Sequence, residues 1–511
     1  MTAPQPIVGR VEECSAAKRR LGVFRIAAMA MAIVAAASRW TGASAAPNVP
    51  RLDATPCSAA LARISNVTCY TLVVPENRST NTARTISIPI VVRRALNGPP
   101  HQSHALFFSI GGPGSDTMFR IERRVQGIPL VRTHDVVWFE QRGLAAATPP
   151  LTCSEYSNAR LEILEHNLSR DDAERTEFAA ATRCRQRLVG SGIDLSAYNT
   201  REIARDLIDL SGLLGYKMDL YGLSYSATVM LEVLKLRPDL VRSAYLDSTL
   251  PPDVSIDEVG IANQYRAFDA VFSDCEADLE CRRAFKGSSV VFRKLLAALT
   301  LHPVAVTLKT PEGQPFPFEI NGRAAFDALS NILYDPDQVG TIPKTVFSAS
   351  RGDYSALIGA IQGNISPSFF AWGQRLSVWC HDFAPLDDSA AVAKEDSLYS
   401  EVAGLVAETV PAPVCKAWNV GNTSTLAQGP FTSSVPALIY GGEYDPNIPP
   451  AWEAHVASSF PNSTVIVFQG RSHGAGETPC GWQMFDAFVT APSNPIDVRC
   501  VSQLGPAKFV L

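Results

Sequence analysis

Residues 218–226 of this chain read M-D-L-Y-G-L-S-Y-S, and they decide its fold. The segment Met-Asp-Leu-Tyr at 218–221 predicts a short buried strand, Gly222 allows a sharp turn, and residues 227–236 predict a helix that ends before an Arg-Pro pair. A serine on such a turn between strand and helix, here Ser224, exposes its hydroxyl as a nucleophile, and the N-terminus of the following helix favours negative charge beside it. The same pattern also occurs by chance in ordinary loops, so the partners of Ser224 decide between the two interpretations.

Two later segments supply the partners that a nucleophilic serine needs. Asp445 follows the apolar run 435–440 and two glycines, and His473 follows a second apolar run at 464–468. Both positions come just after the carboxyl ends of predicted strands, where open α/β sheets carry their sites. The chain order serine, acid, histidine is that of an α/β-hydrolase triad. His381 is the one serious rival to His473, and it lies in a segment predicted below to be a cap.

An oxyanion-binding turn is predicted at residues 107–115, which read F-F-S-I-G-G-P-G-S. An apolar strand that runs into glycines exposes backbone N–H groups, and we expect the donors to come from the Gly111-Gly112 turn and from Tyr225. The segment does not predict a nucleotide-binding loop, because no Gly-Lys-Ser/Thr follows and the glycine spacing differs.

Six motifs connect these segments to a known group of proteins. They are G-G-P-G-S at 111–115, W-F-E-Q-R-G at 138–143, Y-G-L-S-Y-S at 221–226, R-S-A-Y-L-D-S-T-L-P-P at 242–252, V-P-A-L-I-Y-G-G-E-Y-D-P-N-I-P-P at 435–450 and H-G-A-G-E-T-P-C at 473–480. Together they resemble the proline iminopeptidase and secreted tripeptidyl aminopeptidase group of serine peptidases, from about Cys57 onward and most weakly between about Ser255 and Gln428. The resemblance implies a secreted α/β-hydrolase with a helical cap that cuts single residues or short peptides from free N-termini. It places Ser224, Asp445 and His473 in the triad, and it matches Gly111, Gly112 and Tyr225 to the oxyanion segment.

The chain departs from that group at several positions. Glu140 stands where the group usually has Asp, and Ala145 and Ala147 stand where Gly and Ser are expected. Ser226 replaces the last glycine of the turn around the nucleophile, and a small serine fits there if its hydroxyl finds a partner. These changes bear on the peptide specificity more than on the hydrolytic machinery.

The domain organisation follows from the change in apolar spacing along the chain. From 251 to 428 apolar residues recur at helical spacing without alternating strands and helices, which predicts an inserted, mainly helical cap. The α/β-hydrolase core, a mostly parallel sheet flanked by helices, then comprises residues 46–250 and 429–511. Its strands are predicted at 71–74, 86–93, 105–110, 135–139, 218–221, 244–247, 435–440 and 464–468.

An aminopeptidase must also bind a protonated α-amine, which carboxylates do best through charge-assisted hydrogen bonds. The candidates are Asp382, Glu443 and Glu258, although each could equally be a solvated surface charge. A carboxylesterase or lipase of the same fold is the alternative, because the triad and the oxyanion turn serve esters equally well. A catalytically inactive binding protein is a third possibility, and the complete triad argues against it.

The N-terminus predicts export. The apolar run 26–37 follows a basic segment at 18–25, and A-S-A at 43–45 offers a cleavage site, so residues 1–45 are expected to be a signal peptide and the mature protein to be secreted or periplasmic. A short uncleaved membrane anchor is the alternative; after cleavage no stable membrane partner is expected. With 511 residues and a net charge of −5, the chain has no basic surface that predicts nucleic-acid binding. We expect a peptide or small ester as substrate and no cofactor, and the oligomeric state does not follow from the sequence.

The cysteines agree with an oxidising compartment. Of eleven cysteines, Cys14 leaves with the signal peptide and ten remain. Pairing of sequence neighbours is our prediction, although connectivity does not follow from sequence alone: Cys57 with Cys69, Cys153 with Cys184, Cys275 with Cys281, Cys380 with Cys415, and Cys480 with Cys500. A metal site is not expected, because no C-x-x-C pair occurs and Cys380-His381-Asp382 has no clustered partner at ligand spacing.

Overall fold

The computed structural model describes residues 49–80, 82–98, 102–310, 313–364, 370–400, 402, 410–421, 426 and 431–511. The predicted signal peptide at 1–45 lies outside the described residues.

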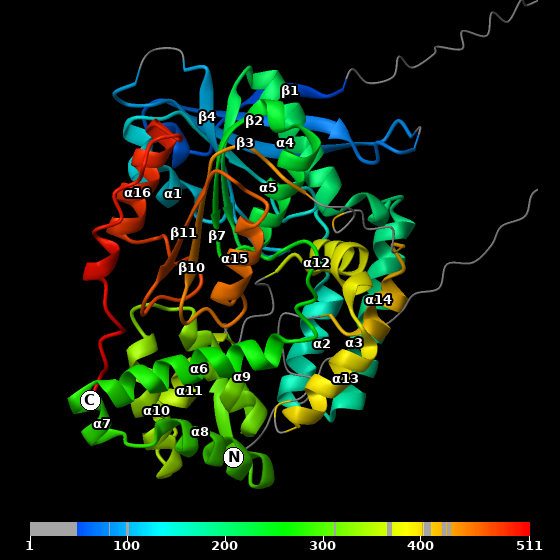
Figure 1. Cartoon of the computed structure of the whole chain (residues 1–511). Helices are drawn as coiled ribbons and strands as arrows, with labels where there is room; N and C mark the ends of the chain where they lie inside the picture. The colour runs from blue at the N-terminus through cyan, green and yellow to red at the C-terminus, as the bar shows by residue number, and fades with distance from the viewer. Residues whose placement is uncertain are drawn as a thin grey trace, which may run out of the picture. The chain divides into compact units, whose positions relative to one another are not determined.

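One large sheet organises the core (Figure 1). Its strands, in the order in which they lie, are β1 (Arg51–Thr55), β2 (Val67–Pro75), β3 (Thr85–Arg93), β5 (Val136–Phe139), β4 (His104–Ser109), β6 (Lys217–Leu223), β7 (Val241–Asp247), β10 (Ala437–Gly442) and β11 (Ser463–Phe468). β1, β2 and β3 form an antiparallel edge that joins β5, and every pairing from β5 to β11 is parallel. This mostly parallel sheet is that of an α/β-hydrolase, so the predicted fold class is confirmed. All eight predicted strands are present, and β1 was not predicted.

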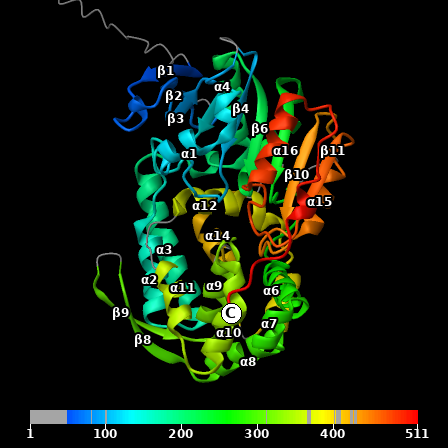
Figure 2. The ribbon, with the colours of Figure 1, turned by 90° about the vertical axis from the view of Figure 1, so that its left-hand side faces the viewer.

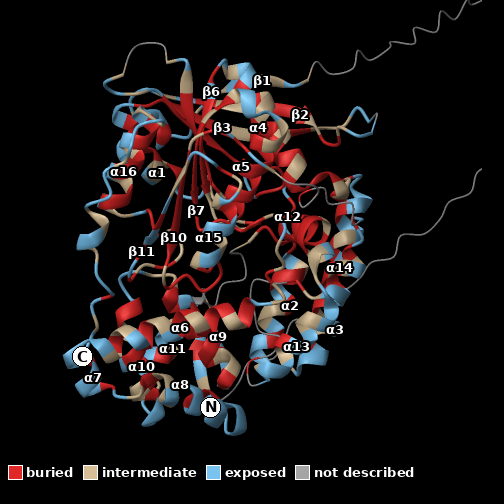
Figure 3. Ribbon diagram, in the orientation of Figure 1, coloured by how far each residue is buried: buried red, intermediate tan, exposed pale blue. Residues whose placement is uncertain are grey.

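Helices cover both faces of the sheet because its central strands are apolar on both sides. Neighbouring residues of one strand enter different cores: Leu220 packs with α4 (Thr200–Leu214) and α5 (Tyr225–Leu236), whereas Tyr221 packs with α1 (Ile121–Gly127) and α16 (Pro479–Thr490). Figure 3 shows the strands buried and the outer faces of the helices exposed. The sheet is therefore a rigid platform whose carboxyl edge can hold a site.

The segment between β7 and β10, called the cap below, is mainly helical: apolar residues from 261 to 361 share one core, whereas those at 372–383 and 410–420 pack in the core beside the sheet. Its helices are α6 (Gly260–Ala277), α7 (Leu279–Ala284), α8 (Ser288–Leu301), α9 (Gly322–Leu333), α10 (Ile342–Ser350), α11 (Ser355–Asn364), α12 (Trp372–Val378), a π-helical turn at Trp379–Phe383, α13 (Ser389–Leu398) and α14 (Ala412–Trp418). The helical part was expected from the apolar spacing, but the hairpin of β8 (Val304–Lys309) and β9 (Pro315–Ile320) was not. In β9 the buried residues alternate at Phe316, Phe318 and Ile320. This alternation is so short that the helical spacing of apolar residues around it prevented its prediction.

A helical hairpin from before the nucleophile lies against the cap. α2 (Ser154–Glu165) contacts β9, and α3 (Arg170–Gly190) packs along α14 (Figure 2). The side chain of Asn167, between the two helices, hydrogen-bonds Glu319 at 2.7 Å and Asn321 at 2.6 Å. The helices of this layer therefore come from two separate parts of the sequence, one before β6 and one between β7 and β10.

Five disulfides link the described chain, and all five predicted pairs are confirmed: Cys57–Cys69, Cys153–Cys184, Cys275–Cys281, Cys380–Cys415 and Cys480–Cys500. Cys153–Cys184 joins the residue before α2 to α3, and Cys380–Cys415 joins the π-helical turn to α14. None of the helices in the described ranges has the length and apolar character needed to cross a membrane.

Candidate active site

Ser224 lies on a tight turn between β6 and α5. Its backbone has φ 60° and ψ −132°, a positive φ that a non-glycine residue adopts only under constraint. Gly222 is required by the close approach of strand and helix, since a Cβ there would lie 2.5 Å from the Cα of Ala227. The backbone N–H of Ser224 donates to the carbonyl of Asp247 at 2.9 Å, which ties the turn to the end of β7.

Asp445 and His473 meet beyond the ends of β10 and β11. Nδ1 of His473 lies 2.8 Å from Oδ2 of Asp445, while Oδ1 accepts the N–H groups of Asn447 and Ile448 at 2.9 Å each. Burial alone would raise the pKa of Asp445, but the charge and hydrogen bond of His473 together with the two N–H groups hold that pKa below its usual value. An ionised Asp445 bound at Nδ1 leaves Nε2 of the imidazole as the proton acceptor.

The histidine loop and the glycine turn both adjoin the nucleophile. A Cβ at Gly474, next to His473, would lie 3.5 Å from Leu223, the residue before Ser224. A Cβ at Gly111 would lie 2.5 Å from the Cβ and 3.0 Å from the Oγ of Ser224, so this turn passes directly over the serine. Gly112 has φ 126°, a conformation that glycine adopts without strain.

Tyr225 begins α5, so its backbone N–H belongs to the unpaired N-terminus of that helix. Its ring is buried and its hydroxyl pairs with Thr200 at 3.0 Å. The side chain is thus occupied within the core, and the N–H is the group that Tyr225 can offer an oxyanion.

Ser226 finds the partners that its position requires. Its Oγ accepts the N–H of Leu223 at 2.8 Å, and the hydroxyl proton faces the carbonyl oxygens of Ser109 at 2.8 Å and Leu223 at 2.9 Å. Since Ser109 ends β4 and leads into the glycine turn, Ser226 joins the nucleophile turn to the oxyanion turn.

Glu140 and Gln141 brace the oxyanion turn from the end of β5, a role that sequence reasoning missed. The Glu140 carboxyl accepts the N–H groups of Thr117, Met118 and Gln141 at 3.1 Å each. Gln141 donates through Nε2 to the carbonyl of Ile110 at 3.1 Å. Burial, reinforced by the nearby Asp116 and opposed by the N–H groups, raises the pKa of Glu140 to about 8. The signal was present as consecutive polar residues directly after a predicted buried strand.

The three predicted substrate-binding carboxylates have partners within the fold. Asp382 accepts the N–H of Thr200 at 2.7 Å and pairs with Nδ1 of His381 at 2.7 Å. Glu443 accepts the N–H of Gly470 at 3.0 Å, and Glu258 accepts the N–H of Asp388 at 2.7 Å. The rival histidine, His381, is therefore paired with Asp382 in the cap rather than with Asp445.

A carboxyl pair beside Glu258 was not predicted. Asp257 and Asp387 are hydrogen-bonded to each other, and burial followed by the charge of Asp387 raises the pKa of Asp257 well above its usual value. Oδ1 of Asp257 is buried and lacks a hydrogen-bond partner among the described residues. Arg375 lies close enough to act on the charge of Asp257, and its guanidinium donates to the carbonyl of Pro113 at 3.0 Å. This arginine thus connects the pair to the oxyanion turn.

The cap also contacts the segments of Asp445 and His473 directly. Arg266 on α6 donates to the backbone carbonyls of Glu443, at 2.7 Å, and of Asp445. The ring of Tyr334 meets the imidazole of His473 edge-on, with centroids 5.4 Å apart. The cap therefore covers the acid and the histidine.

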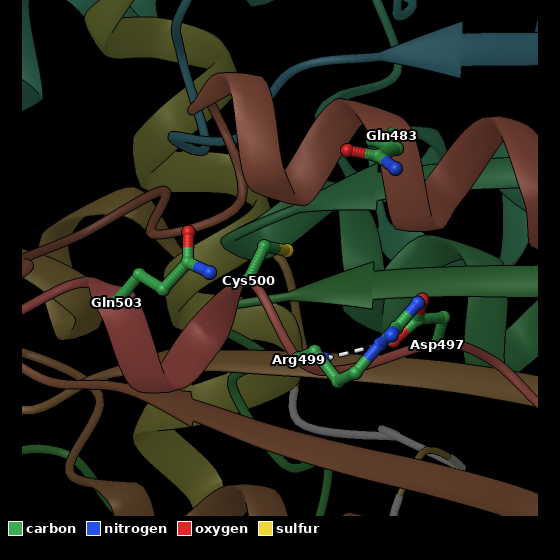
Figure 4. Close-up of a pocket in the computed structure, with 5 residues that line it drawn as sticks. All are labelled: Gln483, Asp497, Arg499, Cys500 and Gln503. Atoms are coloured by element: carbon green, nitrogen blue, oxygen red, sulfur yellow. Dashed lines mark hydrogen bonds and ion pairs between the residues drawn. The ribbon is translucent and has the colours of Figure 1, made fainter.

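The structure also has a surface hollow that none of these residues lines (Figure 4). It is lined by Gln483, Asp497, Arg499, Cys500 and Gln503, and Arg499 is ion-paired with Asp497 at 2.6 Å. In the described chain one group of three possible metal ligands occurs, Cys153, Glu155 and Cys184, but its two sulfurs form a disulfide and cannot act as thiolates.

The parallel sheet, the sharp turn at Ser224 between strand and helix, and the bonded pair of Asp445 and His473 after later strands are the arrangement of an α/β-hydrolase, and the chain is a hydrolase of this fold. Residues 400–500 match the family described as TAP-like protein, which agrees with the resemblance of the C-terminal segment noted in the sequence.

The chain is similar to curated proteins and to solved structures. The chain is 23% identical over 435 residues, 78% of this chain and 79% of the relative, to a putative hydrolase of Mycobacterium bovis and to carboxylesterase B of Mycobacterium tuberculosis. A proline iminopeptidase from Mycobacterium smegmatis aligns over 83% of this chain and 93% of its own at 14% identity and a TM-score of 0.31. An esterase from Thermogutta terrifontis aligns over 79% and 91% at 13% identity and a TM-score of 0.32.

Proposed function

We propose that this protein is an exported serine hydrolase that releases single residues or short peptides from free N-termini through an acyl-enzyme. The observations that carry the hydrolytic part are the bonded pair of Asp445 and His473, the approach of the next residue, Gly474, to the residue before Ser224, and the Gly111 turn over Ser224. The five disulfides support export, because such bonds persist in oxidising compartments.

The mechanism follows from the roles of these groups. Nε2 of His473 takes the proton of Ser224 as Oγ attacks the carbonyl carbon, while Asp445 holds the tautomer and stabilises the imidazolium. The oxyanion that forms accepts hydrogen bonds from the N–H groups of the Gly111-Gly112 turn and of Tyr225. The imidazolium then protonates the leaving amine, and water, deprotonated by the same histidine, hydrolyses the acyl-enzyme.

The preference for a free N-terminus rests on the Asp257–Asp387 pair. One proton shared between two carboxyls leaves the pair with a single negative charge, which complements an α-ammonium group. The buried Oδ1 of Asp257 supports this role as an acceptor. Arg375, which acts on the charge of Asp257 and donates to the carbonyl of Pro113, supports a position near the turn predicted to bind the oxyanion. The proposal thus assigns binding of the α-ammonium group to Asp257 and Asp387, which lie near Glu258. The sequence had suggested Asp382, Glu443 and Glu258 for this role.

A paired substrate panel tests the assignment. We expect kcat/KM for an N-acetylated peptide p-nitroanilide to fall about 10²-fold or more against the free peptide, since the blocked amine cannot make the charge-assisted hydrogen bond that the free α-ammonium donates to the carboxyl pair. Asp257→Asn should lower kcat/KM for the free peptide while leaving the acetylated one unchanged. Asp253→Asn is the matched control, because this exposed carboxylate pairs with His455 at the surface. Equal rates on free and blocked peptides would exclude the aminopeptidase.

A carboxylesterase acting on small acyl esters is the second candidate, favoured by the name of the relative from Mycobacterium tuberculosis. An esterase does not bind an α-ammonium group, so Asp257→Asn should leave its rates unchanged. Faster cleavage of p-nitrophenyl acyl esters than of any peptide in the panel, together with that indifference, would favour this candidate.

A further inference from the structure

The end of β7 touches both the nucleophile turn and the histidine loop. The carbonyl of Asp247 accepts the N–H of Ser224 at 2.9 Å, and its carboxylate oxygen Oδ2 accepts the N–H of Gly476 at 2.9 Å. The next residue, Ser248, accepts the N–H of Gly474 through Oγ at 2.9 Å. Two consecutive residues therefore hold the loop on both sides of Ala475, directly after His473.

The contact is so close that a side chain does not fit at Gly476. A Cβ at Gly476 would lie 2.0 Å from the hydroxyl of Tyr245 and 2.8 Å from Oδ2 of Asp247. Both Asp247 and Ser248 are fully buried, so each hydrogen bond is shielded from water. The loop backbone is thus seated against the end of β7.

Ser248 is held in a strained conformation to make this contact. Its φ is 50°, in a region where a non-glycine residue pays a conformational cost, and its N–H donates to the carbonyl of Tyr440 at 2.9 Å. The hydroxyl donates to Oδ1 of Asp247 at 3.2 Å, which leaves its oxygen free to accept from Gly474. Strain retained at a buried position that contacts a catalytic loop is typical of a functional constraint.

We propose that Asp247 and Ser248 are positioning residues that hold His473 at its working distance from Ser224. They touch neither the substrate nor the reacting atoms, and they act through the backbone of the histidine loop. Loss of either contact lets the imidazole drift, and a displacement of about 1 Å can cost about 10²-fold in rate. The proposal rests on the triad assignment of the proposed function.

The charge of Asp247 gives the contact a pH dependence. Burial raises the pKa of Asp247 to about 6, opposed by the N–H of Gly476 and the hydroxyl of Tyr245. The titratable groups that face it are Tyr245 on the same strand, Tyr440 and Tyr221 on the neighbouring strands, Glu453 on α15 (Pro450–Ala457), and Glu477 and His473 on the loop. Protonation replaces charge-assisted hydrogen bonds with weaker neutral ones, so the hold on the loop loosens below about pH 6.

The test uses a fluorophosphonate, which labels an activated serine whatever the natural substrate is, and p-nitrophenyl acetate. We expect Ser248→Ala to lower the labelling rate constant and the kcat for the ester by about 10- to 10²-fold, with KM changed less than about twofold. Ser248→Gly relieves the positive φ but also lacks the hydroxyl, so its Tm should exceed that of Ser248→Ala while its labelling rate stays equally low. Ser243→Ala on the same strand is the control, since it removes a buried hydroxyl bonded to Asp219 and should leave the labelling rate unchanged.

The pH profile separates positioning from a purely structural role. In the wild type both His473 and Asp247 must lose a proton before labelling is fast. The labelling rate should therefore rise more steeply with pH on the acid side, the acid limb of the profile, than it would for one proton. In Asp247→Asn the limb should become that of one proton, with a lower plateau. A wild-type labelling rate in Ser248→Ala or Ser248→Gly, or an unchanged limb in Asp247→Asn, would overturn the proposal. Absence of labelling at Ser224 in the wild type would instead overturn the triad assignment, so the two failures are distinguishable.

Discussion

Ser226→Ala should uncouple the nucleophile turn from the oxyanion turn. In the folded protein the Ser226 hydroxyl is fully buried and links the N–H of Leu223 to the carbonyl of Ser109. Alanine has almost the same volume and a better helix propensity, so the substitution removes the two hydrogen bonds without overpacking. Any change in rate then reports on the link between the two turns.

The expected magnitude follows from the groups left behind. A buried N–H without an acceptor costs about 1–3 kcal/mol, and loss of a donor to a carbonyl costs about 1 kcal/mol, so the free energy of unfolding should fall by about 2–4 kcal/mol. Because Ser109 leads into Gly111 and Gly112, the oxyanion donors should move relative to Oγ of Ser224. Removal of one such donor costs about 10²- to 10³-fold in kcat, and a displacement should approach the lower value.

The assay is urea unfolding together with kcat for p-nitrophenyl acetate. Thr228→Val on the same helix is the matched control: it keeps the shape of a buried side chain and removes its hydrogen bond to the carbonyl of Leu250, at 2.7 Å. The control should lose about 1–2 kcal/mol of stability with kcat unchanged. If Ser226→Ala loses comparable stability but keeps kcat within about threefold of the wild type, the link between the turns has no catalytic role.

The remaining predictions concern the triad, Glu140 and the cysteines. Ser224→Ala should lower kcat by at most on the order of 10⁶-fold and Asp445→Asn by about 10⁴-fold, while circular dichroism shows folded protein; a tenth of wild-type turnover in Ser224→Ala would exclude it as nucleophile. In the folded protein Glu140 keeps its proton up to about pH 8, whereas in the unfolded chain it releases the proton near pH 4.5. The protonated carboxyl therefore contributes fully to the free energy of unfolding below about pH 4.5, and this contribution is lost as the pH rises to about 8. Glu140→Gln, which does not titrate, should therefore gain stability relative to the wild type between about pH 5 and pH 8.5 in urea unfolding, and a pH-independent difference would contradict the raised pKa. Titration of the unfolded, unreduced mature protein with a thiol reagent should find no free thiol, and two or more per chain would refute complete pairing.

The sequence by itself determined the elements and the candidate triad. Apolar runs placed eight strands, and the order of Ser224, Asp445 and His473 placed the candidate site at the carboxyl edge of the sheet. These features depend on local patterns, because a strand, a sharp turn or a helix is specified by neighbouring residues. The disulfides were accessible for the same reason, since their cysteines lie 6 to 35 residues apart.

Only the tertiary structure decided which distant groups meet. The bond from Gly476 to Asp247 spans 229 residues and that from Gly474 to Ser248 spans 226, because both depend on the parallel register of β7 against β10. The pairing of Asp257 with Asp387 depends in the same way on how the cap folds back on itself. No local pattern encodes such contacts: a strand's period fixes which face a side chain takes, whereas the assembled sheet and cap fix what that side chain touches.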